Sequence, residues 1–145
     1  GSVYEVATTD PSELSKISTL SVSTWITDIA RLPRIELPGT AQHVVQRGLD
    51  RSACFCTDLD RCFYLSSLQR AASQSDCQLH AYILMTNHVH LLVTGERPRA
   101  VCAMMQSLGT RYAQYFNGRY TRTGPLWEGR FSSSPVESNG YVIRC

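Results

Sequence analysis

Two histidines separated by a single residue stand in the stretch TNHVHLLV, residues 86–93. Side chains at positions i and i+2 of a β-strand point to the same face, so His88 and His90 would lie side by side while Val89 and Leu91 face the core. Two neutral imidazoles placed in this way can bind one divalent metal ion. The ordinary alternative, two rings that face solvent or form hydrogen bonds, is left open by the pair alone.

The histidines are expected to lie on one strand of a hairpin. CQLHAYILMTNHVHLLVTG contains two apolar runs broken at Thr86-Asn87, which predicts strands near 78–85 and 88–94. Upstream, AQHVVQRG alternates and includes Val44-Val45, which predicts a first strand near 41–47.

Two helices are expected around this hairpin. Thr57 or Asp58 can cap a helix over 58–74, whose apolar residues recur near one stripe. A second helix is expected to begin with Pro98 in its first turn and to end at Asn117-Gly118.

The remainder is read as a loop, an extended piece near 127–133 and the start of another helix after Glu137 or Ser138. The order of elements predicts an α+β fold, the ferredoxin-like split βαβ sandwich, with an antiparallel sheet and helices on one face. That architecture hosts many functions and does not decide between them.

Charge divides the chain in two. Residues 1–29 carry a net charge of −3, whereas residues 30–145 carry +5, and every positive side chain in the second part is an arginine. We therefore expect 1–29 to be an N-terminal appendage, poorly ordered or docked, and 30–145 to be the functional domain. The planar arginine fork suits phosphate recognition, although an ordinary solvated surface could have the same composition.

Length, hydropathy and cysteine content narrow the class further. The 145 residues correspond to one domain, and the chain has neither a long apolar run nor a signal-peptide pattern, so a cytoplasmic protein without a membrane span is expected. Six irregularly spaced cysteines without a CxxC pair predict reduced thiols in place of disulfides or structural zinc.

Three segments resemble a known family. AYILMTNHVHLLV is similar to the histidine–hydrophobe–histidine signature of the HUH single-strand transposases, in the branch of REP-associated tyrosine transposases. ARLPRIELPGTAQHVVQRGLDR resembles the opening of that family, and GRYTRTGPLWEGRFSSSPVES resembles its downstream block. The resemblance runs from about Ala30 to Cys145.

The resemblance implies a prokaryotic nuclease, monomeric or homodimeric, that cuts single-stranded DNA beside a hairpin. His88 and His90 would hold Mg²⁺ or Mn²⁺, and a tyrosine hydroxyl would attack the scissile phosphate, leaving a 5′-phosphotyrosine and a free 3′-OH. The alternative is a non-catalytic module that binds hairpin or single-stranded DNA. An RNA-binding sheet is disfavoured, because the exposed strand positions lack a pair of stacking aromatics.

The family's nucleophile lies several residues beyond the position of Tyr141, and a polar third metal ligand follows it. The chain ends at Cys145, so it is expected to lack both. Tyr141 is the nearest substitute, about 10 Å short of that position at 1.5 Å per helical residue. Tyr112 and Tyr115 have the spacing of core aromatics and are weaker substitutes.

The remaining candidates surround this centre. Glu128 is expected to orient one histidine. Trp127 is expected either to stack on an unpaired base or to anchor its loop on the core, whereas His43 and His80 are expected to be structural. Candidate phosphate contacts are the arginines near the first strand and the WEGRF block, namely Arg47, Arg51, Arg122 and Arg130.

Overall fold

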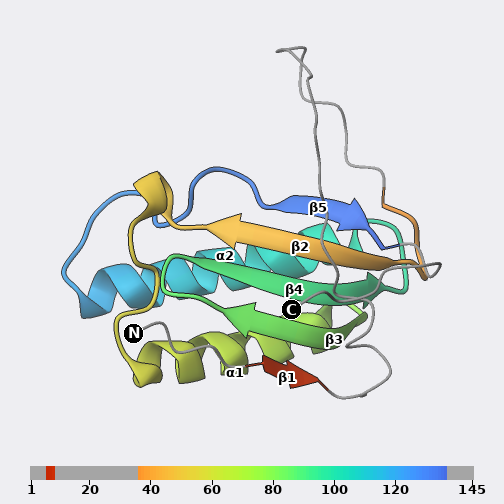
Figure 1. Cartoon of the computed structure of the whole chain (residues 1–145), viewed down its shortest axis with the longest axis horizontal. Coiled ribbons are helices and arrows are strands. Elements are labelled where there is room, and N and C mark those ends of the chain that lie inside the picture. Colours follow the sequence, from red (N-terminus) through yellow and green to blue (C-terminus); the bar gives the residue numbers. More distant parts are fainter. Residues whose placement is uncertain (1–5, 9–35, 137–145) are drawn as a thin grey trace, which may run out of the picture.

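In the computed structural model, which describes residues 6–8 and 36–136, a five-stranded antiparallel sheet carries two helices on one face (Figure 1). The strands lie in the order β1-β3-β4-β2-β5. Without β1, this is the order of a ferredoxin-like fold, so the predicted fold class is confirmed. The elements are β1 (Val6–Thr8), β2 (Ala41–Arg47), α1 (Asp58–Gln74), β3 (Cys77–Leu84), β4 (His88–Gly95), α2 (Ala100–Arg119) and β5 (Ser132–Pro135).

The core lies between the sheet and the helices. Val44 of β2 and Val89 and Leu91 of β4 are buried there, and the side chains of Leu68 in α1 and Met104 in α2 belong to the same cluster. Burial of each such side chain stabilises the fold by about 1.5–3 kcal/mol. Because strand residues alternate between faces, the residues between these valines and leucines project to the opposite face of the sheet.

A buried carboxylate joins the start of α1 to the end of α2. Thr57 and Asp60 form a capping box, in which the Asp60 carboxylate also accepts the backbone N–H of Cys56 at 2.9 Å. The hydroxyls of Tyr115 and Tyr120 donate to the same carboxylate at 3.0 and 2.7 Å. Asp60 is fully buried, so α1 and α2 share one hydrogen-bonded anchor.

Several element ends differ from the prediction. Pro98 precedes α2, whose N-cap is Arg99 in the left-handed region (φ 63°), so the chain turns sharply after the proline before the helix begins. At the other end α2 continues through Asn117-Gly118, because buried Phe116 holds the last turn on the core and its carbonyl accepts the backbone N–H of Tyr120.

The strand after α2 also begins further along the sequence than the predicted extended piece near 127–133. Trp127 forms only an isolated bridge with Gly48, and β5 covers 132–135 beside β2. Strand β1, within the segment read as an appendage, was not predicted; it pairs antiparallel with β3. The helix expected after Glu137 lies outside the described residues.

Candidate functional site

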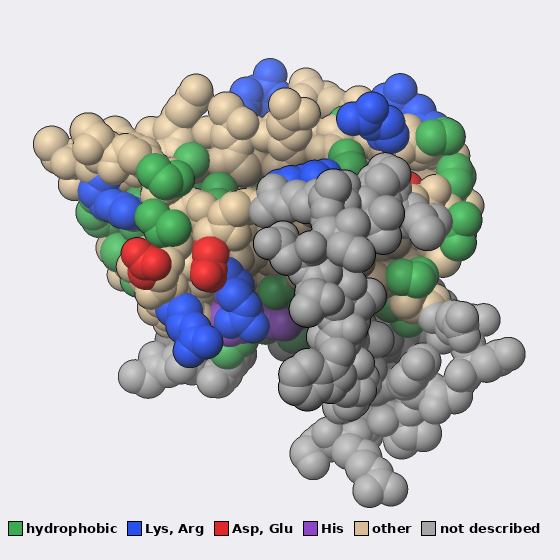
Figure 2. All heavy atoms as spheres, turned by 90° about the horizontal axis from the view of Figure 1, so that it is seen from above, with side chains coloured by type: hydrophobic (Ala, Val, Ile, Leu, Met, Phe, Trp, Pro, Cys, Tyr) green, Lys and Arg blue, Asp and Glu red, His purple; other side chains and the backbone are tan. Residues whose placement is uncertain are grey.

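His88 and His90 lie side by side on β4, on the face of the sheet opposite the helices. Their ring centroids are 4.9 Å apart, and Val89 between them is fully buried on the helix side. Pairing with β2 sets Arg47 opposite His88, and Figure 2 shows histidine surface beside arginine side chains. Strand geometry therefore fixes the positions of the two rings, and the positively charged Arg47 lies on the neighbouring strand opposite His88.

Asn87 fixes the orientation of His88. Its side-chain N–H donates to the carbonyl of Arg51, at 3.3 Å, and its Oδ1 lies 2.6 Å from Nδ1 of His88. An amide oxygen can only accept, so Nδ1 of His88 carries the proton and Nε2 keeps a lone pair for an electrophile. Sequence reasoning missed Asn87, although an asparagine in the turn before the motif was its signal.

His43 plays the corresponding part for His90. Nε2 of His43 lies 2.9 Å from Nδ1 of His90, and the two rings stack with centroids 5.1 Å apart. When Nδ1 of His90 donates this hydrogen bond, Nε2 of His90 also keeps its lone pair, as metal-binding imidazoles require. His43 thus belongs to the site, whereas His80 hydrogen bonds to Thr94 Oγ1 at 2.8 Å, as a structural histidine should.

The surroundings keep both imidazoles neutral. Burial, followed by the charges of His43, His88 and Arg47, lowers the pKa of His90 to about 4. Burial and then the charge of Arg47 also lower the pKa of His88. The uncharged imidazole is the form that binds a metal ion, so the site is ready at neutral pH.

The donor set fits a cation in part. Two Nε2 lone pairs on the same face of one strand are ligands that Mn²⁺ accepts, and hydrogen bonds to Nδ1 hold both rings. Within residues 6–8 and 36–136, no group of three or more histidine, cysteine or acidic side chains could hold a metal ion. Further ligands would have to come from water, substrate or the remaining residues.

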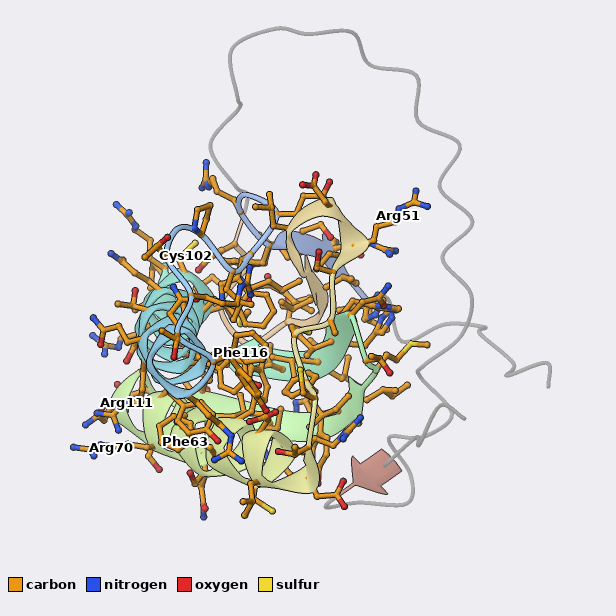
Figure 3. All side chains as sticks on the ribbon, turned by 90° about the vertical axis from the view of Figure 1, so that its left-hand side faces the viewer. Arg51, Phe63, Arg70, Cys102, Arg111 and Phe116 are labelled. Atoms are coloured by element: carbon orange, nitrogen blue, oxygen red, sulfur yellow. The ribbon has the colours of Figure 1, made fainter. Side chains whose placement is uncertain are left out.

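The predicted phosphate contacts divide between two sides of the molecule. Arg47 and Arg51 are exposed near the histidines, and Figure 3 shows Arg51 projecting on the side away from α1 and α2. Arg122 lies in the helix layer, with its guanidinium carbon 5.5 Å from the ring centre of Phe116. Arg130 is exposed beside α2, where it lines a cavity.

Glu128 and Trp127 hold the WEGRF loop in place. Glu128 is exposed, and its backbone N–H donates to the carbonyl of Arg47 at 2.8 Å; a role for its carboxylate beside the histidines stays a prediction. Trp127 is buried beside Tyr64 and Tyr112, and its indole N–H donates to the carbonyl of Gly109 at 3.2 Å. These contacts correspond to the loop-anchoring alternative.

The described tyrosines lie on the other side of the sheet from the histidines. The hydroxyl of buried Tyr112 donates to the carbonyl of Cys54 at 2.6 Å, and Tyr115 is tied to Asp60. Tyr64 also lies in the core, and Tyr82 and Tyr120 pack against the core. Tyr141 lies outside the described residues.

Other predictions can be compared with the structure. Cys54, Cys56, Cys62 and Cys77 are free thiols, as expected. Among the described helices, none combines the length and apolar character needed to cross a membrane.

Comparison with known families bears directly on this arrangement. A sequence model of the family described as "Transposase IS200 like" matches residues 38–144, which include His43, Asn87, His88 and His90. The chain belongs to the IS200-like transposase family. Membership agrees with the resemblance of the histidine stretch to the HUH transposases. No curated protein matches the sequence.

Two solved structures share the fold of this IS200-like transposase. A structure described as a transposase from Deinococcus radiodurans R1 superposes with a TM-score of 0.56 at 17% identity, covering 77% of this chain and 88% of that one. A REP-associated tyrosine transposase bound to a REP hairpin gives 0.54 at 11% identity, covering 77% of this chain and 64% of that one. At sequence identities this low, the similarity shows that the three chains share a fold.

The depressed histidine pKa values of this transposase lead to a prediction for metal binding. Protons compete with the cation for Nε2, and the pKa of both histidines is lowered, that of His90 to about 4, so we expect Mn²⁺ affinity to fall at a lower pH than it would for ordinary histidines. A pair of ordinary histidines, with pKa near 6.5, would lose affinity by about fivefold per histidine between pH 6.5 and 5.5. Calorimetric Mn²⁺ titrations at pH 5, 6 and 7 measure this, and such an early loss would contradict the account.

Proposed function

We propose that this protein cleaves and rejoins single-stranded DNA beside a hairpin, with His88 and His90 at the cleavage centre. The observation that carries the proposal is the pair of neutral imidazoles held by Asn87 and His43, both with Nε2 left as a ligand. The family supplies the reaction class, and the hairpin bound to the REP-associated tyrosine transposase supports the choice of substrate.

The chain's own residues would bind and orient the phosphate. His88 and His90 would hold Mg²⁺ or Mn²⁺, which when bound withdraws electron density from the scissile phosphate. Arg47 and Arg51, both exposed near the histidines, would contact the neighbouring phosphates of the strand. The strand would thus lie across the C-terminal end of β2 and the start of β4.

The proposed chemistry is a transesterification. A tyrosine oxygen forms a bond to phosphorus, the bond from phosphorus to the 3′ oxygen breaks, and that oxygen leaves as a 3′-OH after taking up a proton. The products are a 5′-phosphotyrosine and a free 3′ end, so the strand can be joined again by the reverse reaction. No nucleotide cofactor is required.

Tyr141, the substitute expected about 10 Å short of the position of the family's nucleophile, is the tyrosine of this chain that we assign to the attack. Tyr64, Tyr82, Tyr112, Tyr115 and Tyr120 all pack in or against the core on the helix side, so none can reach a phosphate at the histidines without unfolding. Of the two tyrosines outside the described residues, Tyr4 and Tyr141, we choose Tyr141 because it follows β5, the strand beside β2 and His43.

Covalent capture tests this function. Incubation with Mn²⁺ and a hairpin-bearing single-stranded oligonucleotide labelled at its 3′ end is expected to give a labelled protein–DNA adduct, and Tyr141→Phe is expected to abolish it. Tyr64→Phe is the matched control, because the buried Tyr64 hydroxyl has no hydrogen-bond partner within the described residues and its removal should leave adduct formation unchanged.

The outcomes separate the two functions considered. Hairpin binding without any adduct in Mn²⁺ would favour the non-catalytic DNA-binding module. An adduct that persists in Tyr141→Phe would show that another tyrosine attacks, and peptide mapping of the adduct would identify it.

A further inference from the structure

The outer surface of the helix layer carries positive charge that the cleavage centre does not use. Arg70 of α1 and Arg111 of α2 are both exposed, and Figure 3 shows them projecting from the two helices away from the sheet. Within the part of the chain that the structure describes, neither forms an ion pair. By contrast, Arg61, Arg97 and Arg119 each pair with an aspartate. Two positive charges are therefore left available on the side of the sheet opposite the histidines.

Helix packing brings these two arginines to a similar level. The start of α1 contacts the end of α2, so the two neighbouring helices run antiparallel. Phe63 of α1 stacks on Tyr115 of α2, with ring centroids 3.8 Å apart. At 1.5 Å per residue, Arg70 lies about 10 Å from that stack along α1, and Arg111 lies about 6 Å from it in the same direction along α2. One extended chain of phosphates could therefore contact both guanidinium groups.

Both helices lack acidic side chains around these arginines. There is no acidic residue in α2, and there is none in α1 from Cys62 to Gln74. A shallow hollow on the outer side of α2 is lined by Ala103 and by five side chains that can all donate a hydrogen bond, namely Gln106, Ser107, Thr110, Arg111 and Gln114. Arginine, serine, threonine and glutamine are among the side chains that contact phosphate oxygens in complexes with DNA. The chemistry of this surface therefore suits a polyanion.

We propose that this arginine face, made of Arg70, Arg111 and the polar residues of the α2 hollow, binds the phosphate backbone of double-stranded DNA. Arginines that neutralise phosphates release the counterions of the duplex, and this release drives binding that does not depend on sequence. Serine, threonine and glutamine side chains add phosphate contacts that carry no sequence information. The inference rests on the proposed function in taking the polyanion to be DNA.

The aromatic residues favour a duplex over a single strand on this face. Proteins bind single strands by stacking unpaired bases on accessible aromatic rings. Among the exposed residues of 62–74 and 100–119 there is no aromatic side chain, and the half-buried rings of Phe63 and Tyr115 stack on each other. The arginine face is therefore suited to a backbone whose bases are already paired.

The sheet separates the arginine face from the cleavage centre. His88 and His90 lie on the face of the sheet opposite the helices, and buried Val89 and Leu91 belong to the core between the two surfaces. A duplex bound on the helices would leave the histidines accessible. One molecule could therefore hold a strand for cleavage and a second DNA segment at the same time.

The dependence of duplex affinity on salt tests the arginine face. The measurement is fluorescence anisotropy of a labelled, blunt-ended DNA duplex of mixed sequence, titrated with the full chain at increasing salt concentration. Each phosphate contact contributes about −0.9 to the slope of log affinity against log salt. We expect Arg70→Gln and Arg111→Gln each to make this slope shallower by about 1 and to weaken binding about tenfold at low salt.

Arg97→Gln is the matched control. It removes the same charge from an arginine that already pairs with Asp76 at 2.9 Å, so the slope and the affinity should stay near those of the wild type. Arg70 and Arg111 are exposed, and glutamine forms helices nearly as well as arginine, so their variants should unfold at the wild-type temperature.

His88→Ala with His90→Ala separates this proposal from the cleavage function, because it should slow adduct formation while leaving duplex affinity unchanged. Three results would overturn the arginine face without bearing on cleavage. They are equal slopes in Arg97→Gln and in the two arginine-face variants, loss of duplex binding in the double histidine variant, and stronger competition by duplex RNA than by unlabelled duplex DNA.

Discussion

Replacing His88 and His90 together by alanine is expected to slow DNA strand cleavage by about 100- to 1,000-fold, since a metal ion at the phosphate contributes several kcal/mol to the transition state and each 1.36 kcal/mol is tenfold in rate. Both side chains lie on the face opposite the core, and neighbouring Val89 and Leu91 stay buried. The double variant should therefore stay folded, and the lower cleavage rate should come from the loss of the metal ligands.

The rate is to be measured as single-turnover formation of the protein–DNA adduct at saturating DNA. His80→Ala is the matched control. His80 lies on the neighbouring strand β3, and its ring is hydrogen-bonded to Thr94 and not to His43, His88 or His90. His80→Ala should retain nearly the wild-type rate. Equal rates in the double variant and the wild type would show that His88 and His90 take no part in cleavage.

Replacing Asp60 by alanine is expected to lower the free energy of unfolding by about 2–4 kcal/mol, because it leaves several buried donors without a partner. These donors are the backbone N–H groups of Cys56 and Thr57 and the hydroxyls of Tyr115 and Tyr120. Urea unfolding followed by tyrosine and tryptophan fluorescence measures the change.

Asp58→Ala is the control for this substitution. Its side chain is 92% exposed and forms a surface ion pair with Arg61, so its loss should cost about 0.5 kcal/mol or less. If Asp60→Ala and Asp58→Ala unfold at the same urea concentration, the buried carboxylate does not anchor the two helices.

The contribution of Asp60 should also depend on pH. Burial raises its pKa, but the hydrogen bonds from Tyr120, from the N–H groups of Cys56 and Thr57 and from Tyr115 outweigh burial and lower the pKa below the ordinary value of 3.8. A carboxyl whose pKa is lower in the folded state stabilises the fold above its unfolded pKa, and this stabilisation is lost as the pH falls through the folded value. The advantage of the wild type over Asp60→Ala should therefore shrink below about pH 4.

Local signals in the sequence located most of the fold. Thr57 and Asp60 mark the start of α1 through their capping box, and alternation about Val44 marks β2, because both patterns depend on neighbouring residues alone. The ends of α2 depend on more distant contacts. Asn117-Gly118 is a stop signal in isolation, yet the burial of Phe116 carries the helix past it.

The candidate site was likewise predictable where it depends on neighbouring residues, and not where it depends on contacts between strands. The HVH spacing alone places His88 and His90 on one face. His43 comes from another strand, and only the register of β2 against β4 brings it to 2.9 Å from His90.

Paramagnetic broadening of histidine ring signals by Mn²⁺ tests the central claim most directly. With substoichiometric Mn²⁺ added to the full chain at pH 7, the account predicts that the ring signals of His88 and His90 broaden first, that His43 follows, and that His80 stays sharp longest. Broadening of all four histidines together, or of His80 before the pair, would contradict a metal centre at His88 and His90.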